Sequence, residues 1–316
     1  MNRIFDSALF KTLILCFWGA VALSCARDDG AFYEGSFDIQ NPKIVVASQV
    51  TGGMALVMYD IQGQFIKVLH DYVSQGNIPR GLAVLNPLEF LVSIEGNDHI
   101  DQFSLVSGLS TFVSDINLTG NIYDIAKHDE YGVFVIETNT IDAFDFATGE
   151  RKRSPYIATT VGSCVLSTPR AMTFNQEGHL VVVNTGNDDI NVYDVSDPSG
   201  PTCVRNNTTM GNLDPVAIVA HSDGYLYVGT LQDDRIYRFN GNGAGAGTVI
   251  FNNISQINNP TAIVEMPDGS LLVASDGTNA LVNISTTGDI LTGSNFVSDV
   301  YTNSISDIII LQESAP

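Results

Sequence analysis

The stretch Pro260-Thr-Ala-Ile-Val-Glu-Met-Pro-Asp-Gly-Ser-Leu-Leu-Val-Ala, residues 260–274, sets the pattern for the rest of the chain. Its two apolar runs flank Pro-Asp-Gly-Ser, in which Pro presets a turn and Gly accepts a positive φ. A second turn, Asp276-Gly-Thr-Asn, precedes an apolar run at Ala280, and a third, Thr286-Thr-Gly-Asp, precedes another at Ile290. This pattern predicts four short antiparallel strands joined by hairpin turns.

The same unit recurs along the chain. Its other starting points are Pro79, Ile122, Pro169, Pro215 and Ile305, and the successive intervals are 43, 47, 46, 45 and 45 residues. A period in the forties with four strand signals is typical of the blades of a β-propeller, in which each unit needs neighbours to bury its apolar faces.

The two ends of the chain complement each other. Residues 305–312 supply a first strand without a second, and the segments that begin at Lys43, Ala55 and Phe65 supply the three missing strands. Pairing the two ends would remove an open sheet edge. The sequence therefore predicts an all-β fold: a six-bladed β-propeller of four-stranded antiparallel blades, closed by pairing the C-terminal strand with the N-terminal blade.

The first 25 residues predict a secretory signal. A basic start precedes an apolar core at residues 12–23, which is shorter than the roughly 20 residues that a membrane-spanning helix needs. Val21-Ala-Leu-Ser-Cys25 resembles the lipobox of bacterial lipoproteins, in which the Cys becomes the lipid-modified first residue. We expect lipidation at Cys25, a tether over residues 26–42 and the propeller over residues 43–316. Cleavage nearby with a soluble product is the alternative.

The charge of the chain limits its partners. With 14 basic and 35 acidic residues, the net charge is −21. Nucleic acid is not expected to bind, because such binding depends on neutralising phosphates with Lys and Arg. The signal instead predicts an exported protein of the bacterial cell envelope, anchored to a membrane on its periplasmic or surface side. We expect this protein to be a monomer.

Two cysteines, Cys164 and Cys203, remain in the mature domain. In an exported protein such a pair suggests a disulfide. The predicted register, however, places Cys164 beyond the end of one fourth strand and Cys203 near the start of the next, which can leave them on opposite faces of the ring. A disulfide and two free thiols therefore both remain open at this stage, since a bridge requires close Cα atoms.

The mouth of the central channel is the first candidate site. Innermost strands line this channel in a propeller, and the residues after their starts include Asp307, Arg80, Asp124 and Arg170, which alternate in sign. One interpretation is a polar binding site for a ligand. The other, which we favour, is an ion-pair network between blades, because alternating charges can satisfy one another.

A metal site is the second candidate. Glu137, Asn184 and Asp276 follow second strands near the same face, and they carry the oxygen ligands that Ca²⁺ prefers. We expect no cofactor, with calcium as the alternative. No motif for nucleophilic or phosphate chemistry is present, so no catalytic residue is assigned.

Two histidines form a third candidate. His128 and His221 fall at equivalent positions, at the ends of the first strands of the third and fifth blades. They could share a ligand or a metal ion. Each also precedes a turn, Asp129-Glu-Tyr-Gly132 or Ser222-Asp-Gly224, so a hydrogen bond to that turn is the other interpretation.

The repeat from Pro260 to Val282 resembles those of NHL-type and surface-layer-type propellers, and it is similar to the superfamily of six-bladed calcium-dependent lactonases. The lactonase-like group carries a metal-binding Glu in a Gly-Glu-Gly-Pro start to its first blade, where this chain has Ser304-Ile-Ser-Asp-Ile. We therefore expect a non-enzymatic binding or scaffold protein that presents a propeller face to a protein or small-molecule ligand. The alternative is a calcium-dependent hydrolase, lactonase-like, or a lyase, acting at the central channel.

Overall fold

The computed structural model describes residues 41–50, 53–72, 77–96, 99–113, 121–197, 199–291, 295–299 and 302–312. The predicted signal, the lipidation site at Cys25 and nearly all of the tether lie outside these residues. Within them, no helix has the length and apolar character needed to cross a membrane.

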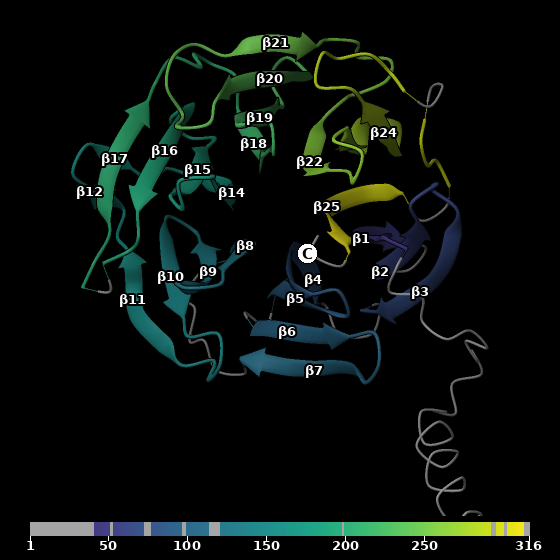
Figure 1. Cartoon of the computed structure of the whole chain (residues 1–316), viewed down its shortest axis with the longest axis horizontal. Helices are drawn as coiled ribbons and strands as arrows, with labels where there is room; N and C mark the ends of the chain where they lie inside the picture. Colours follow the sequence, from purple (N-terminus) through teal and green to yellow (C-terminus); the bar gives the residue numbers. More distant parts are fainter. Residues whose placement is uncertain are drawn as a thin grey trace, which may run out of the picture.

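Six of the seven sheets in the described part of the chain are arranged around a central axis (Figure 1), which confirms the predicted six-bladed propeller. From the axis outward, the first blade is β25 (Asn303–Leu311), β1 (Lys43–Val50), β2 (Gly53–Asp60) and β3 (Phe65–Asp71), and the second is β4 (Ile78–Asn86), β5 (Glu89–Glu95), β6 (His99–Ser104) and β7 (Gly108–Val113). The third is β8 (Ile122–His128), β9 (Gly132–Glu137), β10 (Thr140–Phe144) and β11 (Arg151–Ile157), and the fourth is β14 (Pro169–Phe174), β15 (Leu180–Asn184), β16 (Asp189–Asp194) and β17 (Thr202–Asn207). The fifth is β18 (Pro215–Ala220), β19 (Tyr225–Thr230), β20 (Arg235–Asn240) and β21 (Thr248–Phe251), and the sixth is β22 (Pro260–Glu265), β23 (Leu271–Ser275) and β24 (Ala280–Ile284).

The ring closes as predicted, through the first blade. β25 pairs antiparallel with β1, from Lys43 opposite Leu311 to Gln49 opposite Asn303. Six clusters of buried apolar side chains fill the spaces between neighbouring sheets in the described part of the chain, one at each interface. The cluster between the sixth and first blades joins residues such as Leu272 to Val57 and Ile308. Because apolar burial contributes about 25 cal/mol per Å², these interfaces hold the ring together.

The sixth blade departs from the predicted four strands. Among the described residues between β24 and β25, two isolated bridges reach the sheet, Ile290 with Ile284 and Val297 with Leu281. The segment also packs against the first blade, at the turn between β2 and β3. A Cβ added to Gly63, whose φ is +81°, would lie 2.9 Å from the carbonyl oxygen of Phe296 in the segment. A segment held from both sides in this way touches the outer edge of the sheet at separate points rather than along a continuous strand.

Side chains in the turns connect successive blades. In three turns between second and third strands, a side-chain oxygen accepts a hydrogen bond from the backbone N–H of the residue that precedes the inner strand of the next blade. That residue has a φ near +50° in each case. The pairs are Asn139 Oδ1 with Thr168 N, Asp188 Oδ1 with Asp214 N, and Asp234 Oδ1 with Asn259 N, each at 2.7 Å. The acidic turns at 186–189 and 232–234 are thus hairpin turns that fix the next blade.

A short hairpin, β12 (Thr160–Val161) and β13 (Cys164–Val165), lies between the third and fourth blades. It brings Cys164 onto the outer strand β17, where Cys164 and Cys203 form a disulfide with Cα atoms 5.7 Å apart. Asn206 Nδ2 donates a hydrogen bond to Ser163 O at 3.0 Å beside it. The hairpin therefore anchors the connection between blades to the rim of the next blade.

Replacing Cys164 and Cys203 together by Ser should lower the free energy of unfolding by about 4 kcal/mol. The two bridged residues are 39 positions apart. Closing a loop of that length lowers the conformational entropy of the unfolded chain, which stabilises the folded state by roughly this amount. Urea unfolding with and without a reducing agent measures the effect. Reduction should destabilise the wild-type protein and leave the double variant unchanged; equal stability of the two oxidised proteins would contradict the prediction.

Candidate functional site

The four residues predicted at the channel mouth come together in the structure. Arg80, Asp124, Arg170 and Asp307 all line a central cavity of about 160 Å³ enclosed by the inner strands β4, β8, β14, β18, β22 and β25. Each inner strand pairs with only one neighbour in its own sheet. Its other edge faces the channel and the next blade, so its free backbone groups need partners there.

The two channel carboxylates serve as those partners. Asp307 Oδ2 accepts from Leu82 N of the second blade at 2.6 Å, and Asp124 Oδ2 accepts from Met172 N of the fourth blade at 2.7 Å. Their second oxygens accept from the next residue's own N–H, Ile308 and Ile125, each at 2.8 Å. Each carboxylate therefore links the inner strand of one blade to that of the next.

These carboxyls titrate abnormally. Burial raises the pKa of Asp307 from its ordinary value to about 7, against the lowering effect of its two backbone hydrogen bonds. Burial also raises the pKa of Asp124, and the negative charge of Asp307 raises it further. Because two like charges close together disfavour ionisation of both, the pair holds a proton at mildly acidic pH.

The predicted ion-pair network between blades is wrong. Arg80 contacts Glu95 of its own blade through both Nε and Nη2. The guanidinium of Arg170 lies over the ring of Tyr123, 4.2 Å from its centroid. In the described residues neither arginine pairs with Asp124 or Asp307, because those carboxylates are occupied by backbone N–H groups of the open strand edges.

The three predicted metal ligands lie at the ends of different sheets and not in the wall of the channel cavity. Asn184 is fully buried; its Oδ1 accepts from Ser167 N at 3.1 Å and its Nδ2 donates to Asp189 Oδ1 at 2.7 Å. Glu137 ends β9, and Asp276 begins the short 3₁₀ helix η1 (Asp276–Thr278). Across the described ranges, no three His, Cys, Asp or Glu side chains gather as metal ligands would. Calcium binding stays a prediction.

A larger cavity of about 350 Å³ lies at the opposite face of the ring. We call this face the second face, and we call the face that carries the turns between second and third strands the first face. The second face is where the inner strands end; it carries the turns between first and second strands and the loops between third and fourth strands. The walls include Asn175 and Gln176 of the β14–β15 turn, His221 of the β18–β19 turn, Tyr225 of β19, and Asn240 and Asn242 at the β20–β21 loop.

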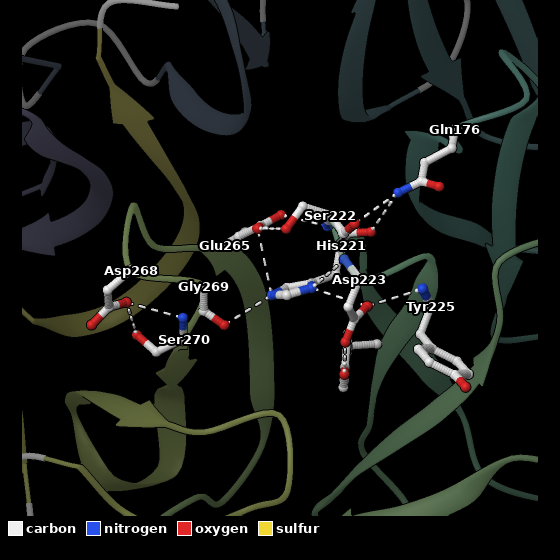
Figure 2. Close-up of polar contacts among 10 residues, drawn as sticks. Gln176, His221, Ser222, Asp223, Tyr225, Glu265, Asp268, Gly269 and Ser270 are labelled. Atoms are coloured by element: carbon white, nitrogen blue, oxygen red, sulfur yellow. Dashed lines mark hydrogen bonds and ion pairs between the residues drawn. The ribbon is translucent and has the colours of Figure 1, made fainter. Parts of the chain in front are cut away.

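His221 anchors one wall of this pocket (Figure 2). It is 4% exposed; its Nδ1 accepts from Asp223 N at 3.0 Å, and its Nε2 lies 3.0 Å from Gly269 O of the sixth blade. Glu265 reaches the same turn, accepting from Ser222 N at 2.9 Å. These contacts fix the β18–β19 turn of the fifth blade against the sixth blade.

His128 makes similar bonds in the third blade. Its Nδ1 accepts from Glu130 N at 3.2 Å and from Tyr131 N at 3.4 Å. The interpretation of both histidines as hydrogen-bonded neighbours of their turns is therefore confirmed.

Two side-chain amides brace the other walls of the pocket. Gln176 Nε2 donates to Ser222 O at 3.0 Å and to His221 O at 3.4 Å, as Figure 2 shows. Asn175 Nδ2 donates to Gly241 O at 3.0 Å. The pocket is thus preformed by bonds between the fourth and fifth blades. Sequence reasoning missed it because its walls come from three separate turns, and only His221 and the glycine-rich loop at 241–247 marked the place.

No family model matches the chain, and no curated protein matches its sequence. Solved structures do match. A crystal structure of a nidogen/laminin complex has a TM-score of 0.64 at 15% identity over 86% of this chain and 99% of that chain. A putative 6-phosphogluconolactonase from Bacteroides fragilis has a TM-score of 0.58 at 13% identity over 88% and 99%. Catalytically inactive virginiamycin B lyase from Staphylococcus aureus, with quinupristin, has a TM-score of 0.55 at 18% identity over 69% and 70%.

These structures share the propeller fold with this chain. They include a protein complex as well as a lyase and a putative lactonase. The fold is therefore common to binding proteins and enzymes and does not choose between them.

Replacing Asp307 by Asn should reduce the pH dependence of stability. The folded carboxyl has a pKa of about 7, above its value in the unfolded chain, so the folded state binds the extra proton. Wild-type stability should therefore fall as pH rises from about 4 to 7 and level off above. Relative to wild type, the variant should gain at least about 1 kcal/mol between pH 5 and pH 8. Urea unfolding at both pH values measures this.

The control is Glu130→Gln, which alters an exposed carboxyl in the β8–β9 turn. Its stability difference from wild type should be the same at both pH values. Parallel pH profiles for wild type and Asp307→Asn would show that Asp307 is ionised throughout this range and would contradict the prediction.

Proposed function

We propose that this chain is a lipid-anchored protein of the bacterial envelope that binds a ligand or partner through the second face of its propeller and catalyses no reaction. The observation that carries the proposal is the preformed pocket of about 350 Å³ on that face. Its size falls within the range of about 300–1,000 Å³ that is typical of ligand sites. Its walls carry polar side-chain atoms that the fold does not use.

The channel is a weaker candidate for binding. Its cavity of about 160 Å³ is below that size range. Its two carboxylates also accept the N–H groups of neighbouring inner strands. A ligand that drew on them would have to compete with the bonds between blades.

The position of the tether agrees with a role for the second face. β1 begins at Lys43, opposite Leu311 at the end of β25, and the inner strands end at the second face. A tether over residues 26–42 spans at most about 60 Å when fully extended. A lipid at Cys25 would therefore keep Lys43, at the second face, within that distance of the membrane.

The test places a photo-crosslinking amino acid at Asn242 on the second face or at Gln232 in the β19–β20 turn on the first face, in cells of the native host. We expect crosslinked envelope adducts from position 242 and not from position 232. Cys25→Ser should move the protein from the membrane fraction to the soluble fraction. Absence of adducts at 242 would rule out a macromolecular partner at the second face, and membrane retention of the Cys25→Ser protein would overturn the lipid anchor.

Calorimetry with calcium separates this function from the alternative of a calcium-dependent hydrolase or lyase. We expect no saturable heat for the wild-type protein and no difference for Glu137→Gln. Asn184→Ala serves only as a second probe, because its buried amide also supports the backbone of Ser167. Tight binding that Glu137→Gln abolishes would favour the enzyme and direct the search to lactones and esters.

A further inference from the structure

We propose that the second-face pocket binds a neutral sugar ring, a conclusion that rests on the proposed binding function and names its ligand. Three features of the pocket carry it: side-chain amide atoms without partners, an exposed aromatic ring, and the lack of an available charge on its walls.

The amide atoms offer both donors and acceptors. Asn240 uses its Nδ2 on Ala244 O at 3.1 Å, and Asn242 uses its Oδ1 on Ala244 N at 3.0 Å. Gln176 uses its Nε2 on the β18–β19 turn. Among the described residues this leaves three groups free: Asn240 Oδ1, Asn242 Nδ2 and Gln176 Oε1. Sugar hydroxyls both donate and accept, so vicinal hydroxyls can satisfy two acceptors and one donor together.

The aromatic ring is that of Tyr225, which is 38% exposed at the start of β19. The guanidinium of Arg238 lies 4.7 Å from its centroid and fixes the ring from one side. A Tyr ring combines an apolar surface with a polar edge. It can therefore pack against the C–H face of a sugar while the amides bind its hydroxyls.

The charges on the walls disfavour anionic ligands. In the described lining, the only carboxyl is that of Glu177 and the only imidazole is that of His221. Glu177 Oε2 lies 3.2 Å from His179 Nδ1, and both ring nitrogens of His221 are engaged by the surrounding turns. No Lys or Arg among the described lining residues is available to an anion, and the net charge of −21 adds to the repulsion.

The shape of the pocket disfavours an extended peptide. Peptides that bind as added strands need an exposed sheet edge. Here the walls are turns, loop residues and the start of β19, the second strand of the fifth blade, which is paired on both sides. A compact ring fits this arrangement better than a strand.

The experiment titrates the full chain, purified in a sugar-free detergent, with glucose, galactose, mannose and N-acetylglucosamine, and follows binding by calorimetry. We expect at least one sugar to bind. Asn242→Ala should weaken that binding at least about fivefold, the factor expected for loss of one neutral hydrogen bond. Tyr225→Ala should weaken it similarly, whereas Tyr225→Phe, which keeps the ring, should bind as wild type does.

Gln232→Ala, an exposed amide on the first face, is the matched control and should not change affinity. Thermal unfolding checks that every variant is folded. If no sugar in the panel binds, or if binding is insensitive to Asn242→Ala and Tyr225→Ala, the sugar assignment is overturned. Crosslinked adducts from position 242 without sugar binding would contradict the sugar assignment alone and support the binding function. If neither adducts nor sugar binding is observed, both the binding function and the sugar assignment are overturned.

Discussion

The pairing of β25 with β1 is the interaction on which the rest of the structure depends. A propeller blade buries its two faces only when it has a neighbour on each side. In an open row of six blades, the first and last would each expose an apolar face. By joining strands from the two ends of the chain in one sheet, this pairing completes the first blade and encloses the apolar cluster between the sixth and first blades.

Closing the ring creates a second requirement at its centre. Every inner strand has an edge without a strand partner in its own sheet, and buried N–H groups at that edge need acceptors. Asp307 and Asp124 supply them across two of the junctions. Burial raises the pKa of both carboxyls, and the negative charge of Asp307 raises that of Asp124 further. The charges that suggested a binding site in the sequence thus contribute to the architecture of the ring.

The second face has a different role in the structure. Its turns are fixed by side chains that reach from one blade to the next, such as Gln176 from the fourth blade and Glu265 from the sixth. Because these bonds brace the backbone, other amide atoms on the same loops remain available at the pocket. Binding residues often lie on loops that a rigid scaffold holds in place, and the second face has this arrangement.

The sequence by itself determined the architecture. The recurring start positions predicted the six blades and their closure, because hairpin turns and apolar runs are local signals. The partners of the polar side chains were decided only by the tertiary structure. Arg80 pairs with Glu95 of its own blade rather than with Asp307, and Gln176, Tyr225 and Asn242 meet in one pocket although they lie on separate turns and loops. Such meetings depend on the angle and register between blades, which no short stretch of sequence encodes.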